Sequence, residues 1–337
     1  MPENSKKTQM VSRKNSIFWS IGSLLLGAGI MFFLNYFTNG LPSITPTEDI
    51  RINDASYTYI NPLLECNVGS SISDELQSFK GDLQEEINKL TKQGEIDSAA
   101  VYFRDMNNGP WFGINETEEF FPASLLKVPV AMAYLKQSES NPALPAEKIV
   151  FATSTNQNVE YFASTPLKLG ATYTVNDLIK AMVVNSDNDA LDLLLTHADA
   201  NNVDPQDTFK YLNVSLAQSG MVTVRQYATF FRILFNSSYL SYDDSEKLLS
   251  MLAQSTFTEG LRAGVPANIP VAHKFGEQWT YTGTERELHD CGIVYYPGHP
   301  YLLCVMTEGS DFDAMASAIS DISFFVYKQV DSQLKNL

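Results

Sequence analysis

Residues 288–308 read Leu288-His-Asp-Cys-Gly-Ile-Val-Tyr-Tyr296-Pro-Gly-His-Pro300-Tyr301-Leu-Leu-Cys-Val-Met-Thr-Glu308, two apolar runs on either side of a short turn. Runs rich in valine, isoleucine and tyrosine are typical of strands. The turn Pro297-Gly-His-Pro300 contains residues that hairpin loops favour. The sequence therefore predicts a β-hairpin near the end of the chain, with strands at Leu288–Tyr296 and Tyr301–Glu308.

Further strands are predicted on both sides of this hairpin. Ala272–Gly276 comes before it, and the runs Ser98–Arg104 and Trp111–Ile114 lie much earlier in the chain, separated by turn-forming residues. Apolar residues at three- and four-residue steps predict helices over residues 71–94, 124–136, 175–197, 208–218, 223–235, 241–252 and 312–334. Together these elements predict an α+β fold, in which an antiparallel sheet built from both ends of the domain is packed by helices and accompanied by an all-helical subdomain.

Composition narrows the class of protein. The chain has 337 residues and a formal net charge of −16, with 44% hydrophobic residues. That share supports a sizeable core, while the absence of lysine or arginine clusters beyond the N-terminus excludes nucleic acid as a partner. The three cysteines, Cys66, Cys291 and Cys304, are too few for a disulfide scaffold, and we interpret them as buried free thiols, with at most one bridge possible.

The N-terminal region predicts a membrane anchor. Residues 17–37 contain no charged side chain, and at 1.5 Å per residue they would extend about 31 Å, enough to cross the hydrocarbon layer. Lysines and arginines lie before this segment, so residues 1–16 are expected in the cytoplasm and the rest outside it. Residues 38–69 read as a tether and 70–337 as the folded domain, a monomer. A cleaved signal peptide is the alternative, but no small-residue cleavage site follows the apolar segment.

Ser124 and Lys127 form the first candidate site, in Phe121-Pro-Ala-Ser124-Leu-Leu-Lys127-Val. Residues three apart share one helix face, so the amine can reach the hydroxyl. A serine hydroxyl is a weak nucleophile until a base removes its proton. Taken alone, the pair is more typical of an N-capping serine followed by a solvated lysine.

Two more motifs follow in the chain. Ser186-Asp-Asn188 lies between two apolar runs, and its simplest interpretation is a turn that caps the next helix. Lys274-Phe-Gly276-Glu277 lies on a predicted strand, where the lysine can point into a cleft and the glycine lets a substrate approach the backbone. A lone Lys-x-Gly triplet has no specificity.

The order and spacing of the three motifs change this assessment. Ser-x-x-Lys, then Ser-Asp-Asn, then Lys-x-Gly is the motif set of penicillin-recognising serine enzymes, and the chain from about Ser71 onward resembles the class A β-lactamases and the wider β-lactamase-like group. Val159-Glu-Tyr161 and the residues leading to Ser186 also look like that family. The resemblance implies a β-lactamase/transpeptidase-like fold and a small-molecule β-lactam or peptidoglycan peptide as substrate.

The resemblance also implies roles for the matching residues. Ser124 would be the acylated nucleophile and Lys127 its general base. Ser186 would relay a proton to the leaving nitrogen, and Asn188 would hold the side-chain amide of the substrate. Lys274 would attract the substrate carboxylate and depress the pKa of neighbouring groups.

Backbone N–H groups complete the implied site. Those of Ser124 and Glu277 would form an oxyanion hole, with Gly276 lining the substrate-binding edge. The sequence differs from the family pattern in two places. No glutamate lies between Asn188 and Glu246, where the family has the base that hydrolyses the acyl-enzyme, and Phe275 stands where the family has a threonine or serine.

Other chemistries have weaker support. The four histidines show no metal-ligand spacing, and Ser124 lacks the Gly-x-Ser-x-Gly elbow of Ser-His-Asp hydrolases, so no metal or cofactor is expected. Three hypotheses remain: a serine β-lactamase, a D,D-carboxypeptidase acting on peptidoglycan peptides, and a non-catalytic domain that binds or senses cell-wall fragments.

Overall fold

The computed structural model describes residues 50–51, 56–65, 74–107, 109–154, 160–162, 165–214, 216, 220–279 and 286–335. The predicted cytoplasmic segment 1–16, the membrane span 17–37 and most of the tether 38–69 lie outside these residues, as does Cys66. Among the residues that are described, no helix combines the length and the apolar character that crossing a membrane requires.

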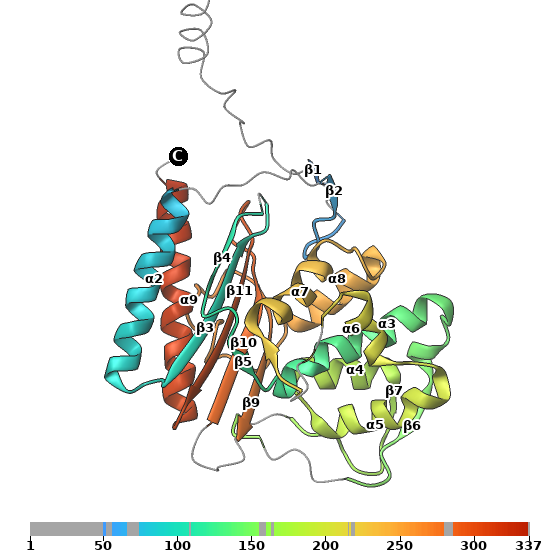
Figure 1. The fold of residues 1–337 in the computed structure, drawn as a ribbon. Coiled ribbons are helices and arrows are strands. Elements are labelled where there is room, and N and C mark those ends of the chain that lie inside the picture. Colours follow the sequence, from blue (N-terminus) through green and yellow to red (C-terminus); the bar gives the residue numbers. More distant parts are fainter. Residues whose placement is uncertain are drawn as a thin grey trace, which may run out of the picture. The chain divides into compact units, whose positions relative to one another are not determined.

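A five-stranded antiparallel sheet lies at the centre of the domain, with strand order β4-β3-β11-β10-β9 (Figure 1). The strands are β3 (Ser98–Asp105), β4 (Trp111–Ile114), β9 (Val271–Trp279), β10 (Arg286–Val294) and β11 (Tyr301–Gly309). The predicted hairpin is confirmed as β10 and β11, and β3 pairs with β11, so the two ends of the domain meet in one sheet.

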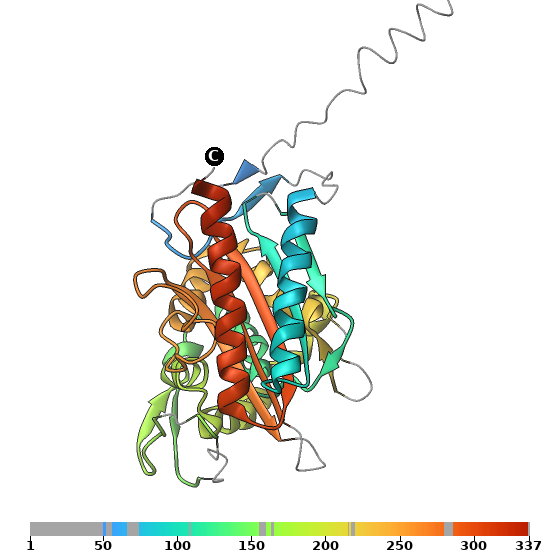
Figure 2. The same cartoon turned by 90° about the vertical axis from the view of Figure 1, so that its left-hand side faces the viewer.

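Two long helices cover one face of this sheet. They are α2 (Asp74–Gln93) and α9 (Phe312–Lys335), which lie side by side in Figure 2. Every second residue of β3 and β11 faces them, as the pleat of a strand requires. The resulting core contains the fully buried Leu83, Val101, Leu303 and Ile319.

The helical subdomain lies on the other face (Figure 1). Its helices are α3 (Lys127–Ser140), α4 (Val175–Val184), α5 (Asn188–Ala198), α6 (Pro205–Tyr211), α7 (Val224–Phe235) and α8 (Tyr242–Leu252). The remaining residues of β10 and β11, such as Ile293 and Met306, point into the core that these helices share with the sheet.

Short elements connect the larger ones. Three two-stranded sheets pair β1 (Ile50–Arg51) with β2 (Leu63–Glu65), β5 (Glu119–Phe120) with β8 (Val222–Thr223), and β6 (Lys148–Val150) with β7 (Thr172–Thr174). The 3₁₀ turns are η1 (Ala123–Leu126), η2 (Leu144–Ala146) and η3 (Asp199–Asn201).

The turn predicted at the Ser186 motif is confirmed, because it divides the helical run expected over 175–197 into α4 and α5. The bounds of another helix need correction. The helix expected over 208–218 begins earlier and ends earlier, as α6, because Asp204 caps its N-terminus, Pro205 occupies its first position, and Asn213 takes a left-handed φ of 51° after it ends.

The cysteine interpretation is wrong for two of the three residues. Cys291 on β10 lies directly opposite Cys304 on β11 in the antiparallel register. Both side chains are fully buried on the helical side of the sheet, and they form a disulfide. Two thiols that face each other across adjacent strands are within reach of a bond, whereas burial alone says nothing about pairing.

Candidate active site

Ser124 lies in the tight turn η1, immediately before α3. A 3₁₀ turn has three residues per turn, so residues three apart are eclipsed and the side chains of Ser124 and Lys127 point the same way. The Lys127 Nζ donates a hydrogen bond of 2.8 Å to the Ser124 Oγ. Pro129 falls in the first turn of α3, where its missing N–H costs no helical bond.

The approach to this turn is anchored by β10. The backbone N–H of Phe121 donates to the Glu287 carboxylate at 2.9 Å, and the His289 Nε2 donates to the Phe121 carbonyl at 2.9 Å. Tyr227 on α7 adds a hydrogen bond of 2.9 Å to the Leu125 carbonyl. The turn that carries Ser124 is therefore held by both the sheet and the helical subdomain.

Ser186 lies in the break between α4 and α5 and has a left-handed φ of 56°. A non-glycine residue in this region costs about 1–2 kcal/mol, so the surrounding contacts must hold it there. Asp187 does so: its carboxylate caps α5 through the Ala190 N–H at 2.7 Å and accepts a second bond from the Leu167 N–H at 3.1 Å. The capping turn and the candidate site are thus the same structure.

Lys274 reaches the site from β9, the edge strand of the sheet. Its Nζ donates to the Ser186 Oγ at 2.9 Å and to the Phe275 carbonyl at 2.7 Å. Gly276, two residues further on, is needed for packing: a Cβ there would lie 3.0 Å from the Pro122 carbonyl oxygen and 3.1 Å from the Leu125 nitrogen. The space beside this glycine is therefore taken by η1, where the sequence had predicted room for a substrate.

The Lys127 amine is the centre of the site. Besides the Ser124 Oγ, three more oxygens lie within hydrogen-bond distance of its Nζ and share its N–H donors: the Ser186 Oγ at 3.0 Å, the Asn188 Oδ1 at 2.6 Å and the Ser186 carbonyl oxygen. Burial lowers the pKa of Lys127, and the attraction of Glu160 opposes that shift. A lowered pKa makes a lysine amine easier to deprotonate, and the neutral amine can act as a base.

The Lys274 amine is fully buried. Burial lowers its pKa well below the ordinary lysine value, and the positive charge of Lys127 lowers it further. The sequence predicted that repulsion between these two amines lowers the pKa of Lys127, and the largest cause that lowers the pKa of Lys127 is burial.

Glu160 is a member of the cluster that the sequence did not predict. Its Oε1 lies 3.4 Å from the Ser124 Oγ, 3.4 Å from the Lys127 Nζ and 3.3 Å from the Ser186 Oγ. It precedes the Ser186 motif, whereas the family that the sequence resembles has its hydrolytic glutamate after that motif. Its only sequence signal is its place in Val159-Glu-Tyr161, which is one of the features that resemble the family.

Glu277 and Phe275 act on the segment that carries Glu160. The Glu277 carboxylate accepts hydrogen bonds from the backbone N–H groups of Tyr161 and Phe162. Burial raises the pKa of Glu277, and these two hydrogen bonds oppose the shift. The Phe275 ring, in place of a family hydroxyl, stacks on Phe257 with ring centroids 4.3 Å apart and lies 4.2 Å from the Lys274 Nζ.

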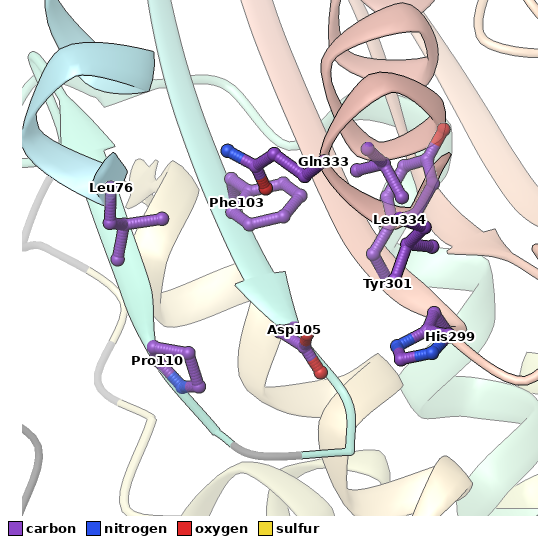
Figure 3. A pocket seen from close by; sticks show the side chains of 9 residues that line it. Leu76, Phe103, Asp105, Pro110, His299, Tyr301, Gln333 and Leu334 are labelled. Carbon is purple, nitrogen blue, oxygen red and sulfur yellow. The ribbon is translucent and has the colours of Figure 1, made fainter. Parts of the chain in front are cut away.

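An open cavity of about 320 Å³ has Ser124, Lys127, Glu160, Asn188 and Glu277 among the residues that line it. A smaller pocket of about 130 Å³ lies at the end of β3, beside the last turn of α9, and is lined largely by apolar side chains with Asp105 and His299 at its edge (Figure 3). Ser124 and the buried Lys127 line the larger cavity and not the smaller one, so we take the larger cavity as the candidate active site.

The histidines on β9 and β10 have structural partners. The His273 Nδ1 lies 2.8 Å from Asp290, whose carboxylate also accepts the Leu261 N–H at 2.8 Å, and His289 holds Phe121 as described above. Within the described part of the chain, no group of three or more histidine, cysteine, aspartate or glutamate side chains is placed to hold a metal ion.

Solved structures share the fold. PBP-A, a mutant of which was solved as an acyl-enzyme complex with penicillin G, is 19% identical, with a TM-score of 0.61 over 75% of this chain and 97% of that one. A β-lactamase from Xanthomonas campestris is 20% identical, with a TM-score of 0.62 over 75% and 98% of the two chains. One from Sphaerobacter thermophilus is 21% identical, with a TM-score of 0.62 over 74% and 97%.

Comparison with curated proteins finds no match. The model of the beta-lactamase enzyme family matches residues 82–330, which span the whole central sheet and the three motifs. The chain therefore belongs to the beta-lactamase enzyme family.

Proposed function

We propose that the protein is a serine hydrolase of the β-lactamase type, acylated at Ser124 by a β-lactam that it then hydrolyses. The observation that carries the proposal is the buried Lys127 amine, 2.8 Å from the Ser124 hydroxyl and 3.0 Å from the Ser186 hydroxyl. Such a group can take the proton of the nucleophile in place and needs no solvent to do so.

Acylation then follows from the geometry. Neutral Lys127 accepts the Ser124 proton as the Oγ attacks the lactam carbonyl carbon, and the backbone N–H groups of Ser124 and Glu277 receive the negative charge that forms on the carbonyl oxygen. The lactam C–N bond breaks, and the Ser186 hydroxyl passes a proton to the leaving nitrogen while its Oγ takes up the proton held by Lys127, 3.0 Å away, so that Lys127 becomes neutral again and Ser186 keeps its hydroxyl. Lys274, 2.9 Å from the Ser186 Oγ, favours the ionised form of that hydroxyl during the transfer.

A D,D-carboxypeptidase acting on peptidoglycan peptides is the second candidate. The observation that favours it is the lack of a glutamate between Asn188 and Glu246, because a carboxypeptidase can turn over without the base that the β-lactamase family has there. The acylation steps would be the same, with a terminal D-alanine as the leaving group. Asn188, whose Oδ1 lies 2.6 Å from the Lys127 Nζ, would bind the amide of the substrate side chain in either case.

We also propose that the domain acts outside the cytoplasm, attached to the cell membrane by a single helix at residues 17–37, as a monomer. The charge-free segment supports this location. The disulfide between Cys291 and Cys304 adds support, since structural disulfides persist mainly in oxidising compartments.

The test uses the full chain in detergent, incubated with penicillin G and followed by intact-protein mass spectrometry, alongside the hydrolysis of a chromogenic cephalosporin. Rapid turnover supports the β-lactamase. A persistent adduct together with D-alanine release from a peptide ending in D-alanyl-D-alanine supports the carboxypeptidase. If no adduct forms with either compound, the domain only binds or senses cell-wall fragments. Ser124→Ala should form no adduct, and an adduct in this variant would exclude Ser124 as the nucleophile.

A further inference from the structure

The Glu160 carboxylate is poorly satisfied for a buried group. Its side chain is 8% exposed. Its Oε1 faces Ser124, Lys127 and Ser186, but its Oε2 is buried without a hydrogen-bond partner among the described residues. Glu160 also lines the open cavity, so a water molecule there can approach its carboxylate.

The segment that carries Glu160 is fixed from two sides. The Glu277 carboxylate accepts the N–H groups of Tyr161 and Phe162, and the Tyr161 hydroxyl donates to Asp313 at 2.6 Å. The Phe162 ring packs at 4.8 Å from Phe257, measured between ring centroids. The orientation of the carboxylate therefore has structural support beyond its own contacts.

The Phe275 ring connects the two departures from the family pattern. It lies 6.3 Å from the Phe162 ring, edge to face, and stacks on the Phe257 ring that Phe162 also contacts. The aromatic residue that replaces a family hydroxyl thus helps to build the support for Glu160. The loss of the hydroxyl and the gain of a carboxylate at the nucleophile are parts of one arrangement.

We infer that Glu160 is the general base of deacylation, and that it replaces the glutamate missing after Asn188. The inference rests on the proposed function, because it assigns a residue to the second half of that reaction. Two observations support it. The Glu160 Oε1 lies 3.4 Å from the Ser124 Oγ, and the Oε2 of the same carboxylate has no hydrogen-bond partner among the described residues.

The groups of the site account for every proton and bond that changes in this step. A water in the cavity, hydrogen-bonded to the Glu160 carboxylate, gives a proton to that carboxylate while its oxygen bonds to the ester carbonyl carbon. The tetrahedral intermediate then collapses, the bond between that carbon and the Ser124 Oγ breaks, and Glu160 returns the proton to the Oγ. The product leaves as a carboxylic acid, and the enzyme regains a carboxylate at Glu160 and a hydroxyl at Ser124.

A Glu160 that only blocked the substrate would affect the rates of acylation and adduct loss differently. A carboxylate between the Ser124 and Ser186 hydroxyls could also exclude the substrate and have no part in hydrolysis. In that case its removal would speed acylation and leave the lifetime of the acyl-enzyme unchanged. A base for water, when removed, leaves acylation in place and lengthens that lifetime.

The test compares Glu160→Gln with the wild type and with Glu85→Gln, a matched change at an exposed position on α2. Each protein is mixed with penicillin G, and mass spectrometry at timed intervals gives the rates of adduct formation and loss. General-base catalysis typically contributes about 10²–10⁴-fold, so we expect Glu160→Gln to lose its adduct at least 100-fold more slowly, with little change in adduct formation. Glu85→Gln should match the wild type.

A pH series adds a readout that a merely structural role would not change. In the wild type, the rate of adduct loss should depend on pH as general-base catalysis does, and Glu160→Gln should lack that dependence. Unchanged adduct loss in Glu160→Gln, or faster adduct formation alone, overturns the inference while the proposed function stands. A wild type that forms an adduct and never loses it also overturns the inference. A wild type that forms no adduct overturns the proposed function itself.

Discussion

Gly276→Ala should push the turn η1, which carries Ser124, away from the edge strand β9 by a small distance that can be calculated. The added Cβ would lie 3.0 Å from the Pro122 carbonyl oxygen, 3.1 Å from the Leu125 nitrogen and 3.2 Å from the Leu125 Cγ, whereas ordinary contacts begin at 3.4 Å. Because two of the three atoms belong to the backbone of η1 or to the residue before it, the turn itself must retreat, by about 0.4 Å at the closest contact.

Two effects of different size follow. Overpacking of this kind costs about 1–3 kcal/mol in the free energy of unfolding. A misplacement of 1 Å near a reacting group can cost about 100-fold in rate, so a retreat of about 0.4 Å predicts a fall of about sixfold in acylation. The assays are denaturant unfolding and the rate of adduct formation with penicillin G.

Gly81→Ala is the matched control, because Gly81 is exposed on α2 and no atom lies within 4 Å of the added Cβ. An exposed helical glycine replaced by alanine should stabilise the protein by about 0.5–1 kcal/mol, with no effect on acylation. If Gly276→Ala acylates at the wild-type rate although it is destabilised, the alignment of η1 with β9 does not control the nucleophile. If it is not destabilised either, the close packing described here is wrong.

Three further predictions concern the base, the core and the disulfide. Because burial lowers the pKa of Lys127, the acylation rate should rise with pH and level off below pH 10.5, the ordinary lysine value, and a rise that continues to that value would refute the assignment. Leu83→Ala, at a fully buried position between α2 and the sheet, should lower the free energy of unfolding by about 2–5 kcal/mol in denaturant titrations, and a loss below 1 kcal/mol would contradict the packing. Replacing Cys291 and Cys304 together by alanine should cost about 2–4 kcal/mol in the same titrations and leave acylation unchanged, and thiol labelling of the unfolded wild type should find neither cysteine free.

Much of the architecture could be predicted because each signal is local. The alternation and turn residues around Pro297 and Pro300 determined the hairpin, and the helical periodicity of residues 71–94 matched α2 within a few residues. The break at Ser186 appeared in the sequence as a polar motif between two apolar runs. Its left-handed backbone depends on tertiary contacts through Asp187 and was therefore not visible.

Two features of the site depend on contacts between distant segments. Glu160 reaches Ser124 only because Glu277 and the aromatic cluster hold its segment over the cavity, and no spacing rule relates these positions. The disulfide depends on the register of the hairpin. The predicted turn Pro297–Pro300, centred between Gly298 and His299, would have set Cys291 opposite Met306, whereas the observed strands end at Val294 and begin at Tyr301, which sets Cys291 opposite Cys304.

The pairing of β3 with β11 has a consequence for how the protein is made. Val101 lies opposite Val305, so an early strand can find its neighbour only after nearly all of the chain has been synthesised. Contacts this remote in sequence slow folding and leave apolar faces uncovered in the meantime. A polypeptide that must be threaded through a translocation channel before it folds benefits from such a delay, whereas a product truncated before β11 would keep its apolar surfaces exposed and become a target for proteases.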